Sequence, residues 1–184
     1  MLVSRELRKK NIAEYLLYMW QVEDLLRANE LSLDKVKRNI VEPYALPDEE
    51  SGELLLWYAD LIDMMHQEGV MEKGHLQINR NVIINLADLH GRLLRSSKVP
   101  FYSAAYYKAL PFVVEFRTKS DGREKNELEN CFDALYMVWM MKLQGRAINE
   151  ETLKATAEIS KFISMLSLYF KEDEEGKLDL ESDE

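Results

Sequence analysis

Hydrophobic residues recur at intervals of three and four positions along most of this 184-residue chain, and no stretch alternates long enough to be a strand. This spacing predicts seven helices. The first runs from Ser4 to Ala28, the second begins at Ser32 and ends before Pro43, and the third ends at Gln67 or Glu68. The other four are expected over about 75–95, from Pro100 onward, up to Gln144, and from Asn149 onward.

Several residues mark where these helices begin and end. The side chains expected to cap helix N-termini, by accepting hydrogen bonds from first-turn N–H groups, are Ser4, Ser32 and Asn149. Gly69 and Gly145 are expected C-caps, because glycine readily adopts the left-handed conformation that ends many helices. Pro111 lacks a backbone N–H and predicts a bend or break in the fifth helix. Residues 120–122, Ser-Asp-Gly, predict a turn.

Two of the predicted helices are apolar on every side. Residues 12–26 and 131–143 place hydrophobic side chains at nearly every angle of a helical projection. Both stretches are too short to span a bilayer, so we expect them inside the protein. The other helices have one apolar face and short connections. The sequence therefore predicts an all-α protein, a single-domain antiparallel helical bundle of about six to seven helices with two central apolar helices.

Most of the net charge of −9 comes from one end of the chain. Residues 172–184 hold eight acidic residues and one lysine, a net charge of −7, which leaves −2 for residues 1–171. We expect a helical bundle domain over 1–171 and an acidic, flexible C-terminal tail over 172–184. The basic cluster at residues 5–10 is too small to give the basic stripe typical of nucleic-acid binding, so nucleic acid is not an expected partner.

Cysteine usage and hydropathy predict a cytoplasmic protein. Cys131 is the single cysteine, which excludes an intramolecular disulfide and a cysteine-based zinc site. Residues 1–11 lack the apolar core of a signal peptide. No apolar run approaches the roughly 20 residues that span a bilayer, so no membrane contact is expected.

Four segments together resemble an uncharacterised bacterial family, a small domain of unknown function. They are NIAEYLLYMWQVEDLLRA (11–28), EKGHLQINRNVIINLADLHGRLL (72–94), PFYSAAYYKALPFVVEFR (100–117) and NELENCFDALYMVWMMKLQ (126–144). The resemblance covers nearly the whole chain apart from the acidic tail. It implies one domain in a bacterial cytosol, and it supplies no catalytic or binding residue.

The histidines leave one metal hypothesis. A metal site needs at least three converging ligands at about 2.0–2.2 Å. In a hairpin of the third and fourth helices, His90 lies roughly 20 Å from the connection, whereas His75 lies near Asp63 and His66. Asp63, His66 and His75 therefore form the only candidate metal site. The favoured interpretation is a histidine at the edge of the core, with no metal and no cofactor.

Glu23 is the sharpest candidate for a functional carboxylate. It follows Ile12, Leu16 and Met19 on an apolar stripe of the first helix. A buried carboxylate needs a cation or a hydrogen-bond donor. Lys142 lies on an apolar face of the sixth helix, and one hypothesis pairs it with Glu23. The pair is either structural, which is favoured, or part of a ligand-binding pocket.

The fifth helix carries an aromatic cluster that indicates a binding surface. Tyr102 and Tyr106 fall on the face expected to pack inward, whereas Phe101 and Tyr107 fall outside it. Exposed aromatic residues of this kind mark grooves or contacts between subunits. The expected partners are a second copy of the chain, bound through the fifth or sixth helix, or another protein. The favoured interpretation, however, is that the bundle simply covers these residues.

The chain contains no familiar catalytic motif: no Gly-x-Ser-x-Gly, no P-loop and no Gly-x-Gly-x-x-Gly. The favoured hypothesis is therefore a non-enzymatic cytoplasmic helical protein that acts by protein–protein binding or self-association. The alternative is an enzyme dependent on a small ligand or a metal, with its site between helices. Such an enzyme would use either Glu23 or the group Asp63, His66 and His75.

Overall fold

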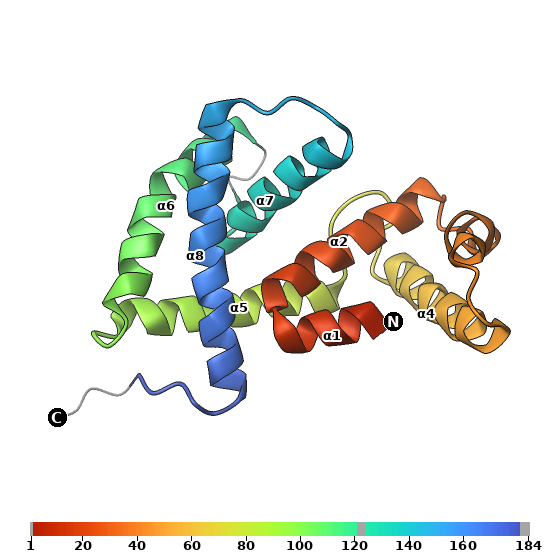
Figure 1. Ribbon diagram of the computed structural model, residues 1–184, viewed down its shortest axis with the longest axis horizontal. Coiled ribbons are helices and arrows are strands. Elements are labelled where there is room, and N and C mark those ends of the chain that lie inside the picture. Colours follow the sequence, from red (N-terminus) through yellow and green to blue (C-terminus); the bar gives the residue numbers. More distant parts are fainter. Residues whose placement is uncertain (1, 121–123, 181–184) are drawn as a thin grey trace. The chain divides into compact units, whose positions relative to one another are not determined.

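A computed structural model describes residues 2–120 and 124–180, and these residues form helices and no strand (Figure 1). This confirms the all-α fold class. In chain order the elements are α1 (Leu2–Lys10), α2 (Ile12–Ala28), α3 (Leu33–Val36), a π-helical stretch η1 (Lys37–Val41), a 3₁₀ turn η2 (Glu42–Tyr44), α4 (Asp48–Gln67), α5 (Gln77–Arg95), α6 (Pro100–Lys119), α7 (Glu127–Leu143) and α8 (Glu150–Glu174).

The first predicted helix is in fact two helices. The chain leaves the helical conformation at Asn11, whose side-chain Oδ1 accepts a hydrogen bond from the N–H of Ala13 at 3.1 Å. Asparagine competes with the helix for backbone donors in this way, and here it begins α2. Ser4 lies buried inside α1, so its prediction as an N-cap is wrong.

The segment after α2 stays helical for longer than predicted. Ser32 caps α3 by accepting from the N–H of Lys35, which confirms that prediction. The helical conformation does not stop before Pro43, because this proline lies at the start of the 3₁₀ turn η2, where its missing N–H is not needed. The run ends at Ala45, which has the left-handed φ of 47°.

Most of the other predicted helix ends are confirmed. Gly69 and Gly145 have left-handed φ values of 69° and 66°, and Asn149 caps α8 by accepting from the N–H of Thr152 at 2.7 Å. Of the bend or break predicted at Pro111, the break is wrong, since α6 continues through this residue, and the bend stays a prediction. Pro111 is exposed, so the carbonyl that it leaves without an N–H partner is on the solvent side. Most of the turn predicted at 120–122 lies outside the described residues.

The chain divides into two compact units. Unit 1 comprises residues 1–10 and 14–82, and unit 2 comprises residues 11–13 and 83–184. Helix α5 belongs to both, because its first six residues lie in unit 1 and the rest in unit 2. The prediction of one domain over 1–171 stays a prediction.

The core of unit 1 is built around α2. This helix buries side chains on most of its sides, as its apolar sequence predicts, so its interior position is confirmed. The largest fully buried side chains of the unit are Leu16, Trp20, Leu26, Met65 and Leu76. Helix α4 contributes a single buried face that includes Tyr58 and Leu61.

The core of unit 2 lies between α5, α6, α7 and α8. Its largest fully buried side chains are Leu86, Leu89, Leu93, Tyr102, Leu128, Phe132 and Phe162. Figure 1 shows α6 and α8 side by side, and both contact α7. Helix α7 is not interior throughout, since Met137 and Leu143 are exposed and its last buried residue is Val138. The prediction that all of 131–143 lies inside is therefore wrong for its second half.

Helix α8 extends three residues into the segment predicted as a tail, to Glu174. Two acidic residues of this segment make ion pairs with earlier residues of unit 2, Asp173 with Arg92 and Asp179 with Lys98. Residues 181–184 lie outside the described residues. Among the described helices, none combines the length and the hydrophobicity that a bilayer crossing requires.

Candidate functional site

Glu23 lies at the centre of a buried polar network in unit 1. Its side chain is 0% exposed, as the apolar stripe around it predicts. Carboxylate oxygen Oε1 accepts from the N–H of Leu76 at 3.0 Å and from the side-chain amide of Asn79 at 2.7 Å. Oxygen Oε2 lies 2.6 Å from Nδ1 of His75. The carboxylate thus has three partners at the start of α5.

Two further contacts fix the orientation of these partners. The imidazole of His75 stacks on the indole of Trp20, with ring centres 4.0 Å apart and an angle of 9° between the planes. The Asn79 side-chain oxygen lies 3.5 Å from the hydroxyl of Tyr15. Because the N-terminus of α5 carries a partial positive charge, the carboxylate of Glu23 is also favoured there by the helix dipole.

Arg27 extends the same contact one turn along α2. Its guanidinium donates to the carbonyl oxygens of Val70 and Gly74, and it pairs with Asp24 at 2.8 Å. Residues i and i+4 share a helix face, so Glu23 and Arg27 together hold the turn between α4 and α5 against α2. This arrangement accounts for the buried carboxylate as a structural anchor.

The predicted pair of Glu23 and Lys142 is wrong. Lys142 is an exposed residue of α7, whereas the partners of Glu23 are His75, Leu76 and Asn79. One sequence signal could have indicated the true partners. Glu23 and Arg27 are four positions apart on one face of α2, so a single segment can bind both. Nothing in the spacing of these two residues indicates which turn that segment is.

The metal hypothesis is also wrong. Asp63 and His66 are exposed, and Nδ1 of His66 contacts the sulfur of Met71 at 3.1 Å. His75 instead faces Glu23 and Trp20. Over residues 2–120 and 124–180, no group of three or more histidine, cysteine, aspartate or glutamate side chains is arranged to hold a metal ion.

The aromatic cluster in unit 2 contains a second buried polar contact. The hydroxyl of Tyr102, a fully buried residue, lies 2.6 Å from Nδ1 of His90. Burial lowers the pKa of His90, against the opposing charge of Glu127, and burial also raises the pKa of Tyr102. Both shifts favour the neutral phenol and the neutral imidazole, and the tautomer of His90 decides which of the two donates the hydrogen bond. Sequence reasoning missed His90 because its partner lies on another helix.

The three predicted tyrosines differ in their surroundings. Tyr102 is buried, as expected for the inward face of α6. Tyr106 is half-buried and donates to Glu127 of α7 at 2.7 Å; burial, followed by this carboxylate, raises its pKa. Tyr107 is 64% exposed. Only Tyr107 presents its ring to solvent and is available to a partner.

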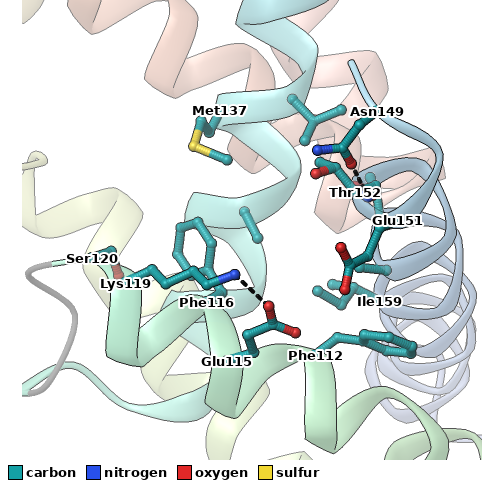
Figure 2. Close-up of a pocket in the computed structure, with 14 residues that line it drawn as sticks. Phe112, Glu115, Phe116, Lys119, Ser120, Met137, Asn149, Glu151, Thr152 and Ile159 are labelled. Carbon is teal, nitrogen blue, oxygen red and sulfur yellow. Dashed lines mark hydrogen bonds and ion pairs between the residues drawn. The ribbon is translucent and has the colours of Figure 1, made fainter.

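A pocket of about 280 Å³ opens between the second half of α6, α7 and the first turns of α8 (Figure 2). Its apolar wall includes Phe112, Phe116, Met137 and Ile159. Its charged residues are Glu115, Lys119 and Glu151, and Figure 2 shows Lys119 turned toward Glu115, with which it pairs.

The polar lining of this pocket combines hydroxyl and carboxylate groups. Its hydroxyl groups belong to Ser120, Thr152 and Thr156, and the Thr156 hydroxyl already donates to the Thr152 carbonyl at 2.6 Å. Activating a hydroxyl nucleophile requires a base within hydrogen-bond reach. The described lining residues include no histidine, and their two carboxylates are Glu151 and Glu115, the second of which is paired with Lys119.

Fold and site together define an all-helical protein with a buried polar network in each of its two units. The chain belongs to the family described as a domain of unknown function, DUF4924, whose model matches residues 1–177. No curated protein and no solved structure matches the chain.

Proposed function

We propose that this protein acts by self-association, and that a second copy binds on the exposed face of α6. One observation carries the proposal: this face is largely apolar. Phe101, Tyr107 and Val114 are 80%, 64% and 50% exposed. Ala104 and Pro111 are exposed between them. Adjoining apolar side chains on a surface are typical of an interaction site.

Charge on this face is low. Lys108 is the cation among these residues, and it is paired with Glu158 of α8 at 2.9 Å. Helix α8 of the same unit gives a direct comparison. Its exposed residues include several charged ones, among them Lys154, Lys161, Lys171 and Glu174. An ordinary solvated helix therefore looks like α8, and α6 differs from it.

The α6 face is complementary to itself under a two-fold axis. If two copies of α6 pack antiparallel about the midpoint between Tyr107 and Lys108, Ala104 lies opposite Pro111 and Phe101 lies opposite Val114. Each tyrosine ring then lies beside the partner's Lys108. Small residues opposite one another allow two helices to approach closely, and a two-fold interface repeats the same patch on both subunits. This complementarity supports a second copy over an unrelated partner.

The interface is narrow, so we expect a weak dimer. A helix of 20 residues is about 30 Å long. One helix face of this length places the contact in the small, transient class of protein interfaces. The setting we propose is a reducing bacterial cytosol, which the buried free thiol of Cys131 supports.

Sedimentation velocity over a concentration series tests the proposal. Wild-type protein is expected to shift toward dimer as concentration rises. Phe101→Asp and Tyr107→Asp are expected to stay monomeric, because burying one large aromatic side chain contributes about 3 kcal/mol and each dimer contains two copies. Leu168→Asp is the matched control, since Leu168 is 57% exposed on α8. The proposal would be overturned if wild-type protein stayed monomeric at the highest attainable concentration. It would also be overturned if Leu168→Asp lost as much dimer as the α6 variants.

The register has its own test. Mixing Ala104→Cys chains with Pro111→Cys chains is expected to give a disulfide-linked heterodimer under mild oxidation, because the two positions lie opposite one another. Each variant alone is expected to cross-link far less. Equal cross-linking in all three samples would contradict the antiparallel register.

A further inference from the structure

A second pocket, in unit 1, has a composition different from the first. It encloses about 250 Å³ between α1, α2, the turn after η2 and the start of α4. The helices that frame it are labelled in Figure 1. Three of its lining residues are tyrosines, three are aliphatic and two are glutamates; they are Tyr18, Tyr44, Tyr58, Val3, Leu46, Leu54, Glu50 and Glu53. No basic residue is among these described lining residues.

The two carboxylates have no countercharge. Glu50 and Glu53 are exposed, three positions apart on one face of α4, and no ion pair to either occurs within the described residues. Glu50 lies in the first turn, where the helix dipole favours an acid, but this effect falls off beyond that turn and does not explain Glu53. Like charges at this spacing repel each other, and a cation between them would relieve the repulsion.

Tyr58 supplies an independent sign of a ligand. Its residue is only 4% exposed, it lines the pocket, and its hydroxyl makes no hydrogen bond to any described residue. Burial, followed by the nearby phenols of Tyr18 and Tyr44, raises the pKa of Tyr58, so this hydroxyl stays protonated at neutral pH. The ring is enclosed by protein, whereas the hydroxyl oxygen keeps some accessible surface, so it is free to contact a ligand in the pocket.

We propose that this pocket binds a small alkylammonium cation, a protonated or quaternary amine on a short hydrocarbon. Aromatic rings that surround a cation attract it through the negative faces of their π-systems. Here the tyrosines supply those rings, the two glutamates supply the opposite charge, and Val3, Leu46 and Leu54 contact the hydrocarbon. An anionic ligand is disfavoured by the same two carboxylates.

The test uses the full-length protein and two probes of equal shape. Choline carries a quaternary ammonium group, and 3,3-dimethylbutan-1-ol is its neutral isostere. Binding is measured by NMR, from the shifts of the Leu46 and Leu54 methyl groups. Choline is expected to bind and the alcohol to bind at least about tenfold more weakly. Equal binding of both probes, or no binding of choline, would overturn the proposal.

Variants separate this site from general charge attraction. The double variant Glu50→Gln, Glu53→Gln is expected to weaken choline binding about tenfold. Glu49→Gln is the matched control, because Glu49 lies in the same acidic first turn but outside the pocket lining, and it is expected to bind as wild type. If Glu49→Gln lost as much choline affinity as the double variant, a specific site in this pocket would be refuted.

Tyr44→Leu and Tyr58→Phe test the rings and the hydroxyl separately. Tyr44 is exposed, so its replacement leaves the core intact, and we expect about threefold weaker binding. Tyr58→Phe keeps the ring and removes the unpaired hydroxyl, and we expect about threefold weaker binding of choline. Unchanged affinity in both variants, measured on protein with a wild-type spectrum elsewhere, would show that the tyrosines do not form the site.

Phosphatidylcholine vesicles distinguish a free amine from a lipid headgroup of the same chemistry. The pocket is small and takes only the head of such a molecule, so we expect free choline to bind and the protein to stay in solution. If wild-type protein co-sediments with the vesicles and the double variant Glu50→Gln, Glu53→Gln does not, the same site binds the cation of a lipid headgroup. Co-sedimentation that this double variant leaves unchanged would count against the pocket.

Discussion

Replacing Glu23 tests how the turn between α4 and α5 is held. Glu23→Ala removes the acceptor of two N–H donors and the partner of His75. Glu23→Gln is the informative comparison. Both N–H donors use Oε1, which glutamine keeps, and the glutamine amide nitrogen takes the place of Oε2 beside Nδ1 of His75. The two variants thus differ mainly in how many buried groups lose their partner.

The magnitudes follow from this count. A buried polar group left without a partner costs about 1–3 kcal/mol, and removing one member of a buried charged contact costs about 3–5 kcal/mol. We expect Glu23→Ala to lower the free energy of unfolding by about 4 kcal/mol, a large part of the 5–15 kcal/mol typical of whole domains. Glu23→Gln should lower it by about 1 kcal/mol.

Urea denaturation provides the assay, with two probes because the chain has two compact units. Circular dichroism at 222 nm reports helix over the whole chain. Fluorescence of Trp20, in a background carrying Trp57→Phe and Trp139→Phe, reports unit 1, since this indole stacks on His75. The fluorescence transition should shift to lower urea in Glu23→Ala and only slightly in Glu23→Gln.

Lys142→Ala is the control. Lys142 is exposed and is not a partner of Glu23, so its replacement should change the free energy of unfolding by no more than about 0.5 kcal/mol. Equal losses in the alanine and glutamine variants would refute the role given to Oε1. A loss in Lys142→Ala comparable to that in Glu23→Ala would restore the rejected ion pair.

Two further predictions concern unit 2. Because burial lowers the native-state pKa of His90, the unfolded chain takes up its proton first as the pH falls below about 6.5, and stability present above that pH is lost. The unfolding free energy should therefore decline from pH 7.5 to pH 5.5 less steeply in His90→Gln than in wild type; identical slopes would contradict this. Burial raises the pKa of the Cys131 thiol, which is almost fully enclosed, so 5,5′-dithiobis(2-nitrobenzoic acid) should react with it only after denaturant is added. Rapid labelling of native protein would disprove it.

Local features of the fold could be predicted, because they depend on residues close in sequence. The caps at Ser32 and Asn149 and the glycines that end α4 and α7 follow from the chemistry of a single residue. The buried position of Glu23 follows from spacing on one helix. The break at Asn11 was missed because the apolar period continues across it, although an asparagine before an apolar run is a valid start signal.

Features that join distant segments could not be predicted in the same way. Nothing in the spacing of α2 indicates that the turn at 68–76 lies opposite Glu23, or that His90 lies beside Tyr102. The alkylammonium pocket draws its lining from four separate segments. Helix α7 shows another limit of the sequence. Apolar residues on every side of a helix predict that it is buried, but they do not say which segments bury it. The second half of α7 is in fact partly exposed.

Helix α5 has a practical consequence for dissecting this protein. A cut after Val82 would follow the division into units, yet it would pass through the middle of a 19-residue helix. The fragments would expose about four carbonyls and four N–H groups that the intact helix pairs internally. Truncations or inserted tags belong instead at the turn beside Gly145, because the turn after Gly69 is bound by Arg27 and Glu23. The boundary between the two units separates two groups of contacting residues, whereas the backbone of α5 continues through it as one helix.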